Sequence, residues 1–132
     1  MEEKEINMLV VDDDDINIFI VRKIAAKTGY TVNLEAKGDG QQALDYLTSL
    51  LADHKPFPEL ILVDINMPLM NGWEFLENYE RLNVPEGTHV YMVSSSVYEN
   101  DIEKAKSYKA VNGFISKPMS LDRLTELIRL LG

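Results

Sequence analysis

The chain has 132 residues, the length of one ordinary domain, and its 45% hydrophobic and 27% charged residues are typical of a globular protein. Thirteen Lys and Arg residues against 22 Asp and Glu residues give a formal net charge of −9, which argues against nucleic-acid binding because phosphates would be repelled. The chain has no cysteine and two widely separated histidines; this excludes a disulfide scaffold and a thiolate zinc site and argues against a Ser-His-Asp triad.

Five short apolar runs predict the β-strands. They occupy residues 8–11, 31–34, 60–63, 90–93 and 113–115. Most of them are continuous rather than alternating in polarity, which is typical of strands that are buried on both faces of a sheet.

The segments between these runs have the apolar spacing of helices. Ile16, Ile20 and Ile24 recur every four residues, which predicts the apolar face of the first helix. Residues 71–81 are predicted to form the third helix, and a further apolar stripe after residue 120 predicts the last one.

Polar residues mark several helix starts. Asp39 with Gln42, and Asn100 with Glu103, have the spacing of capping boxes, and Ser120 is a predicted N-cap.

The predicted strands and helices alternate five times along the chain, which predicts an α/β fold with a doubly wound, five-stranded parallel sheet. In such sheets ligands bind at the carboxyl ends of the strands.

Polar side chains stand at four of the predicted strand ends. The first strand is followed by the acidic run 12–15, the third ends at Asp64, the fourth is followed by Ser94 and the fifth leads to Lys117. Because these ends should meet at one edge of the sheet, carboxylates, a hydroxyl and an ammonium are expected to converge there.

Clustered carboxylates repel one another unless a cation lies between them, and a hard divalent ion with oxygen ligands fits. Mg²⁺ accepts one or two carboxylates, keeps waters and completes its shell with a phosphate oxygen. The set has the groups that phosphoryl transfer needs, and a carboxylate can itself be the nucleophile. Asp64 is the best candidate because it ends the central strand of the group.

Each residue alone has a simpler interpretation. An acidic run before a helix usually caps it, and Asp14 or Asp15 is expected to do only that. Asp64 alone could be a turn residue, Ser94 part of a polar loop and Lys117 a solvated surface lysine. The functional interpretation rests on all four strand ends together.

These residues resemble the receiver domain of two-component response regulators, such as the chemotaxis receivers, and the resemblance covers essentially the whole chain, residues 1–132. It implies a (βα)5 flavodoxin-like receiver fold with strand order 2-1-3-4-5. The motifs that carry it are Asp12 and Asp13, Asp64 with Met67, Pro68 and Gly72, Ser94, and Lys117 with Pro118.

By this resemblance Asp64 is the phosphoacceptor, and its donor is the phosphohistidine of a sensor histidine kinase or a histidine phosphotransfer protein. Mg²⁺ is the implied cofactor. Asp13 and Asp64 would bind it directly, Asn66 through its backbone carbonyl, and Asp12 largely through a bound water.

The resemblance also implies a switch. Lys117 would pair with the incoming phosphoryl group, the attached group would draw Ser94 toward it, and Phe114 would turn into the space that is vacated. The Lys117–Pro118 peptide is expected to be cis, as X-Pro bonds can be. The fourth helix, fifth strand and fifth helix would form the partner surface, with Tyr98, Asn100, Lys104 and Tyr108 as candidates.

Three alternatives differ in class. A phosphatase resembling the haloacid-dehalogenase superfamily needs its nucleophile on the first strand in a D-x-D-x-[TV] pattern, and Ile16 stands at the last place. A calcium loop starting at Asp13 lacks its glycine and final glutamate, at Ile18 and Ile24. A receiver-like interaction module that is never phosphorylated would not need a complete site.

The remaining expectations concern location and activity. No apolar run is long enough to span a membrane, and the acidic start lacks the features of a signal peptide, so a cytoplasmic protein is predicted. The domain is expected to be a switch with self-catalysed phosphorylation and dephosphorylation, and not an enzyme in the usual sense.

Overall fold

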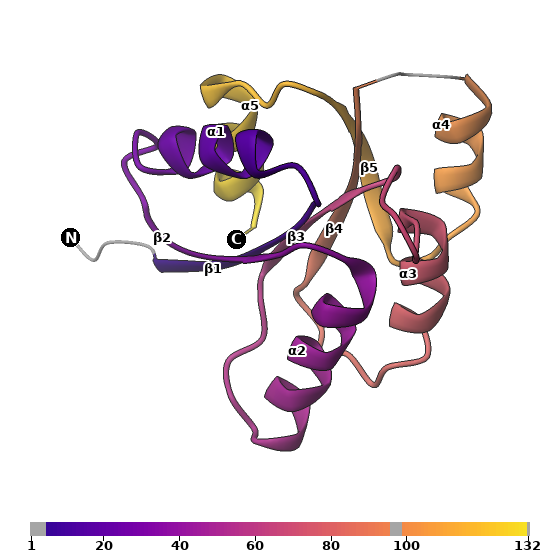
Figure 1. Cartoon of the computed structure of the whole chain (residues 1–132). Helices are drawn as coiled ribbons and strands as arrows, with labels where there is room; N and C mark the ends of the chain where they lie inside the picture. The colour runs from indigo at the N-terminus through magenta and orange to yellow at the C-terminus, as the bar shows by residue number, and fades with distance from the viewer. Residues whose placement is uncertain (1–4, 96–98, 132) are drawn as a thin grey trace.

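Five strands and five helices alternate along the chain in the computed structural model, which describes residues 5–95 and 99–131. Figure 1 shows their arrangement. The elements are β1 (Glu5–Val11), α1 (Asp15–Ala25), β2 (Thr31–Lys37), α2 (Gly40–Ala52), β3 (Leu60–Asp64), α3 (Gly72–Tyr79), β4 (His89–Ser94), α4 (Glu99–Lys106), β5 (Val111–Ser116) and α5 (Leu121–Leu130).

All five strands form one parallel sheet in the order β2-β1-β3-β4-β5. This confirms the predicted doubly wound, flavodoxin-like architecture and its strand order. The chain first adds β2 on one side of β1 and then β3 on the other, so the order reverses between β1 and β3. That reversal places the carboxyl ends of β1 and β3 beside a crevice where ligands of such folds bind.

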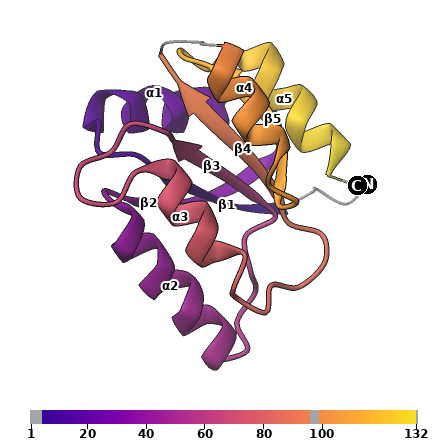
Figure 2. The ribbon, with the colours of Figure 1, turned by 90° about the vertical axis from the view of Figure 1, so that its right-hand side faces the viewer.

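Helices cover both faces of the sheet. Helices α1 and α5 lie on one face, whereas α2, α3 and α4 lie on the other (Figures 1 and 2). Each face has its own apolar core, with Val21 and Leu124 in the first and Leu47 and Phe75 in the second. All residues of β3 are buried, because this central strand is covered from both sides.

The observed helix starts test the predicted caps. The Asp39 side chain accepts the Gln42 N–H at 2.8 Å, and Ser120 accepts the Arg123 N–H at 3.1 Å. The predicted capping box at Asn100 is wrong, because α4 already begins at Glu99. Ala105 is the one buried residue of α4 among those described. The sequence therefore has no apolar stripe from which the start of this helix could be predicted.

The third helix is shorter than predicted. Its N-cap Asn71 and Glu74 form a capping box, which sets the start one residue later than the predicted range. The helix ends at Tyr79, and the Leu82 N–H then bonds to the Tyr79 carbonyl at 3.0 Å, as in a tighter turn.

The apolar face of α1 differs from the prediction by one residue. The buried positions are Asn17, Val21 and Ala25, whereas Ile16 is 72% exposed and Ile24 is only partly buried. The predicted helix is present, but its buried face includes a polar residue, Asn17, in place of Ile16. Among the described residues, no helix combines the length and apolar character needed to cross a bilayer.

Candidate metal centre

The carboxyl ends of β1, β3, β4 and β5 bring the predicted site residues together. Asp12 directly follows β1, Asp64 and Ser94 are the last residues of β3 and β4, and Lys117 directly follows β5. The parallel register aligns these ends, since Asp64 pairs with Val93. The charged groups therefore gather at one edge because adjacent strands end at the same level.

Three carboxylates form an acidic cluster at this edge. Each of Asp12, Asp13 and Asp64 has an oxygen within 4.8 Å of an oxygen of the others. Asp12 and Asp64 are only 2% and 6% exposed, whereas Asp13 faces solvent. Two buried carboxylates and one exposed carboxylate are the donor set that a hard divalent cation with remaining water ligands accepts.

Lys117 supplies the positive charge opposite this cluster. Its Nζ lies 3.0 Å from Asp12 Oδ2 and 3.3 Å from Asp64 Oδ2. The backbone N–H of Lys117 donates to the Ser94 carbonyl at 2.8 Å, and the Lys117–Pro118 peptide is cis. The lysine thus reaches both acids from a backbone that is tied to the end of β4.

The electrostatic balance of the site favours the entry of a further cation. Burial and the nearby charge of Asp12 raise the pKa of Asp64 to about 6, although Lys117 and the Asn66 N–H oppose this rise. Burial alone would lower the pKa of Lys117, but its hydrogen bonds and ion pairs with the two acids raise that pKa overall. One ammonium therefore does not fully compensate the buried acids.

The loop after β3 holds Asp64 from its own backbone. The Asn66 N–H donates to Asp64 Oδ1 at 3.3 Å, and the Asn66 side chain is exposed. The Gly72 N–H donates to the Ile65 carbonyl at 2.9 Å. A Cβ at Gly72 would lie 2.6 Å from the Asp64 carbonyl oxygen, so only glycine lets the start of α3 approach the strand this closely.

The other predicted residues, Ser94 and Phe114, lie at the end of β4 and within β5. Ser94 is 1% exposed at the end of β4. Phe114 is half-buried in β5, pairs in register with Met92 and packs against the core on the face of α2, α3 and α4. Its predicted switching role stays a prediction. Tyr98, proposed for the partner surface, lies outside the described residues.

Asn17 is a site residue that the sequence reasoning missed. Its amide Nδ2 donates to Asp12 Oδ2 at 2.7 Å from the buried face of α1. The sequence does contain a signal for it. Asn17, Val21 and Ala25 are four residues apart and so share one helix face, and Asn17 is a polar residue where that face predicts an apolar one.

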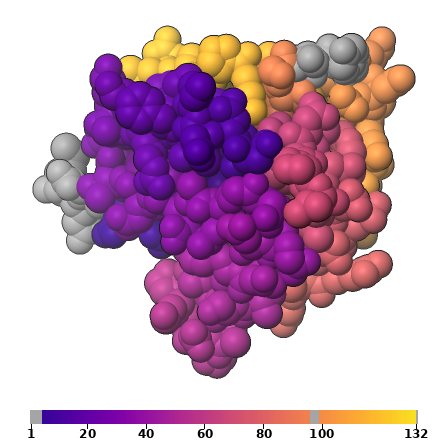
Figure 3. All heavy atoms as spheres, viewed as in Figure 1, coloured from indigo at the N-terminus to yellow at the C-terminus, as the bar shows by residue number. Residues whose placement is uncertain are grey.

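Exposed apolar side chains lie on the two segments that follow the acidic ends of β1 and β3. Ile16 and Phe19, on α1, are 72% and 57% exposed, and Leu69, in the loop after β3, is 95% exposed. Leu69 has φ of 68°, and the Met70 N–H bonds to the Pro68 carbonyl at 2.8 Å across it, which is a strained tight turn for a non-glycine residue. In Figure 3 the indigo surface of α1 meets the surface of the segment after β3.

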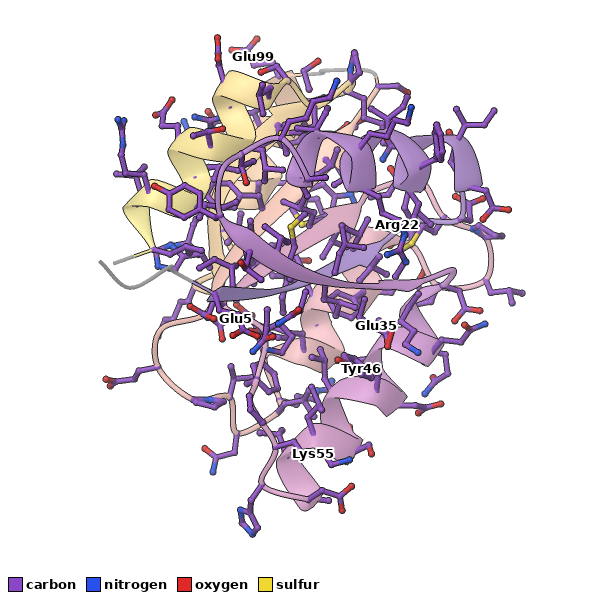
Figure 4. All side chains as sticks on the ribbon, turned by 90° about the vertical axis from the view of Figure 1, so that its left-hand side faces the viewer. Glu5, Arg22, Glu35, Tyr46, Lys55 and Glu99 are labelled. Atoms are coloured by element: carbon purple, nitrogen blue, oxygen red, sulfur yellow. The ribbon has the colours of Figure 1, made fainter. Side chains whose placement is uncertain are left out.

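A separate groove of about 570 Å³ lies beside the edge strand β2. Figure 4 views the molecule from this side, with Glu35, Tyr46 and Lys55 labelled. Burial and the charge of Glu35 raise the pKa of the Tyr46 hydroxyl, and Lys37 Nζ lies 4.9 Å from the centre of the Tyr46 ring. None of the acidic-cluster residues lines this groove.

Comparison with known proteins shows which family the chain matches. The chain matches the family model for the response regulator receiver domain over residues 8–129. The polar-differentiation response regulator DivK of Brucella ovis is 30% identical over 128 residues, which cover 93% of each chain. A solved two-component response regulator from Cytophaga hutchinsonii is 30% identical, covers 98% of each chain and has a TM-score of 0.88.

A third similar protein is much larger. The sensor histidine kinase CheAY of Helicobacter pylori is 30% identical over 122 residues, which are 92% of this chain. Those residues are only 14% of the kinase, so this chain corresponds to a small part of its length.

Proposed function

The chain belongs to the response regulator receiver family, and from that premise we propose that Asp64 accepts a phosphoryl group from a phosphohistidine in a two-component phosphorelay. One observation carries the proposal. Asp64 ends the central strand, and both Lys117 and the acidic cluster lie around its carboxylate. A side-chain acid, a fixed ammonium and a cation-binding donor set are what phosphoryl transfer to a carboxylate requires.

The donor set fits Mg²⁺. Asp13 and Asp64 would bind the ion directly, Asn66 through its backbone carbonyl, and Asp12 largely through a bound water. The ion would neutralise charge on the phosphoryl oxygens. The cluster of one exposed and two buried carboxylates supports a bound ion that keeps water ligands on its solvent side. The division of roles among the three residues is the one that the receiver family implies.

The transfer forms one bond and breaks one. An oxygen of the Asp64 carboxylate attacks the phosphorus, and the phosphorus–nitrogen bond to the donor histidine breaks. The electron pair stays on the imidazole nitrogen, and the product is an acyl phosphate. Lys117, 3.3 Å from Asp64 Oδ2 before the reaction, then pairs with the phosphoryl oxygens. The domain would catalyse only its own phosphorylation and dephosphorylation.

The switch follows from the end of β4. The Ser94 hydroxyl would donate to the new phosphoryl group, and Phe114, half-buried on the adjacent strand, would move inward. This movement would change the surface formed by α4, β5 and α5. Phosphorylation would bias an existing equilibrium between two conformations rather than create a new fold.

The partners proposed for this site are proteins. A histidine kinase or a phosphotransfer protein must bring its imidazole to Asp64, past the exposed Ile16, Phe19 and Leu69. Exposed apolar side chains on the segments next to a charged site suit a partner with an apolar face beside its reactive histidine. We place this exchange in the cytoplasm, with no nucleic acid or membrane as a direct partner.

The test uses the full chain with a small phosphodonor. Phosphoramidate with Mg²⁺ should add one phosphoryl group to the intact protein, as measured by mass spectrometry, and the Asp64→Asn variant should add none. Absence of labelling in the folded parent would favour a non-phosphorylated interaction module. Continuous hydrolysis of a phosphate ester without a stable labelled form would favour the phosphatase alternative.

A further inference from the structure

Asn17 differs from the other buried polar residues of the described chain in its position. These residues are Asp12, Asn17, Asp64 and Ser94, and Asn17 is the one that lies within a helix. Its side chain lines a small, mostly apolar pocket together with Asp12, Asp64, Val10 and Met119. A polar residue there needs a hydrogen-bond partner, and Asp12 provides it.

The start of α1 does not explain this side chain. Asp14 is the N-cap, and its Oδ1 accepts the backbone N–H groups of Ile16 and Asn17 at 3.0 and 3.4 Å. The Asn17 amide is therefore not needed to cap the helix. Its bond of 2.7 Å points to Asp12 alone.

Three donors hold the Asp12 carboxylate. Asn17 Nδ2 and Lys117 Nζ both approach Oδ2, at 2.7 and 3.0 Å, and the Asp14 N–H approaches Oδ1 at 2.8 Å. A carboxylate offers about four acceptor positions, so roughly one remains. That position lies on Oδ1, because both positions on Oδ2 are used.

We infer that Asn17 is a positioning residue that keeps Asp12 as an acceptor for a metal-bound water instead of a direct metal ligand. The inference rests on the proposed Mg²⁺ site. It extends that site because Asn17, through its bond to Oδ2, would determine whether Asp12 binds the metal directly or through a water. Mg²⁺ retains water ligands, whereas Ca²⁺ accepts more protein oxygens, so Asn17 should favour Mg²⁺ over Ca²⁺.

The test compares Mg²⁺ and Ca²⁺ binding to the metal-free full chain by isothermal titration calorimetry. Asn17→Leu removes the donor, and Asn17→Ser, a smaller polar variant, serves if the leucine variant does not fold. Either variant should bind Mg²⁺ about tenfold more weakly, as is typical when a partner behind the metal ligands is removed, and should lose preference for Mg²⁺ over Ca²⁺. Asn78→Leu, on α3, is the matched control because its amide donates only to the Glu74 carbonyl.

A double-mutant comparison separates positioning from a general structural effect. In an Asp12→Asn background, Asn17→Leu should no longer change the ratio of the two affinities, because the carboxylate that it positions is gone. An unchanged ratio in the single variant, or the same change in the Asp12→Asn background, would overturn the inference. If the parent itself binds no Mg²⁺, the proposed metal site fails first, and the parent titration shows this separately.

Discussion

Lys117 Nζ lies 3.3 Å from Asp64 Oδ2, although the two residues are 53 positions apart in the chain. The contact exists because β3 and β5 end at the same edge of the sheet, with β4 between them. It places the ammonium of Lys117 beside the proposed phosphoacceptor, where it can pair with the phosphoryl group. Replacing either residue should therefore change the chemistry of the site in a distinct way.

Lys117→Ala should separate metal binding from signalling. The lysine is not among the proposed ligands, and its removal takes a positive charge away from Asp12 and Asp64, so Mg²⁺ should still bind, no more weakly than to the parent, in a calorimetric titration. The phosphorylation-driven change should weaken, because no ammonium would pair with the phosphoryl group. Hydrogen exchange of α4 and β5 before and after labelling would measure that change. A full response in the variant would show that Lys117 does not transmit the signal.

Asp64→Asn should stabilise the metal-free protein at neutral pH. The pKa of Asp64 is about 6 in the folded protein, above the ordinary value of 3.8, so the folded state holds its proton more tightly than the unfolded state does. The stability of the parent should therefore fall as pH rises from about 4 to 6. Removing the charge should increase the free energy of unfolding at pH 7.5 by on the order of 1 to 2 kcal/mol.

The pH dependence provides the control for this substitution. Below about pH 4 the parent carboxyl is protonated in both states, so the gain from Asp64→Asn should disappear. Urea denaturation of parent and variant at pH 7.5 and below about pH 4, without divalent cations, measures the difference in the free energy of unfolding. An equal gain at both pH values would mean that charge is not the cause.

Gly72→Ala should destabilise the fold next to the site. The added Cβ would meet the Asp64 carbonyl oxygen at 2.6 Å, and backbone atoms cannot move aside as a flexible side chain can. We expect a loss of about 2 kcal/mol in the free energy of unfolding. Gly38→Ala is the matched control, because a Cβ added at Gly38 would meet nothing within 4 Å. Equal losses for both variants would contradict the steric explanation.

Phe19→Ala should slow phosphotransfer from a protein donor but not from phosphoramidate. Phe19 is 57% exposed on α1, the helix that follows Asp12 and Asp13, so it should contact a docked protein but not a small molecule at Asp64. Leu130→Ala is the matched control, since Leu130 is 58% exposed at the end of α5. Rate constants from a phosphorylated kinase or phosphotransfer protein should drop severalfold only for Phe19→Ala. Equal rates for both variants would remove α1 from the docking surface.

The apolar pattern was sufficient to predict the five buried strands and the convergence of Asp12, Asp64 and Lys117, whereas the strand order came from the resemblance to receiver domains. Buried parallel strands leave a clear apolar signal, and adjacent strand ends must meet. The inward face of α1 differs from the one that the isoleucine spacing predicts, because a polar residue, Asn17, lies on it beside Val21 and bonds to Asp12. The start of α4 was missed because a helix with one buried residue leaves almost no periodic signal.

The most direct test of the central claim identifies the phosphorylated atom. After reaction with phosphoramidate and Mg²⁺, borohydride reduction should convert a phosphorylated aspartate to homoserine, and peptide mass spectrometry would locate it. We predict conversion at Asp64 alone, with none when the divalent cation is chelated. Conversion at Asp12 or Asp13 instead, or undiminished labelling of Asp64→Asn, would contradict the account.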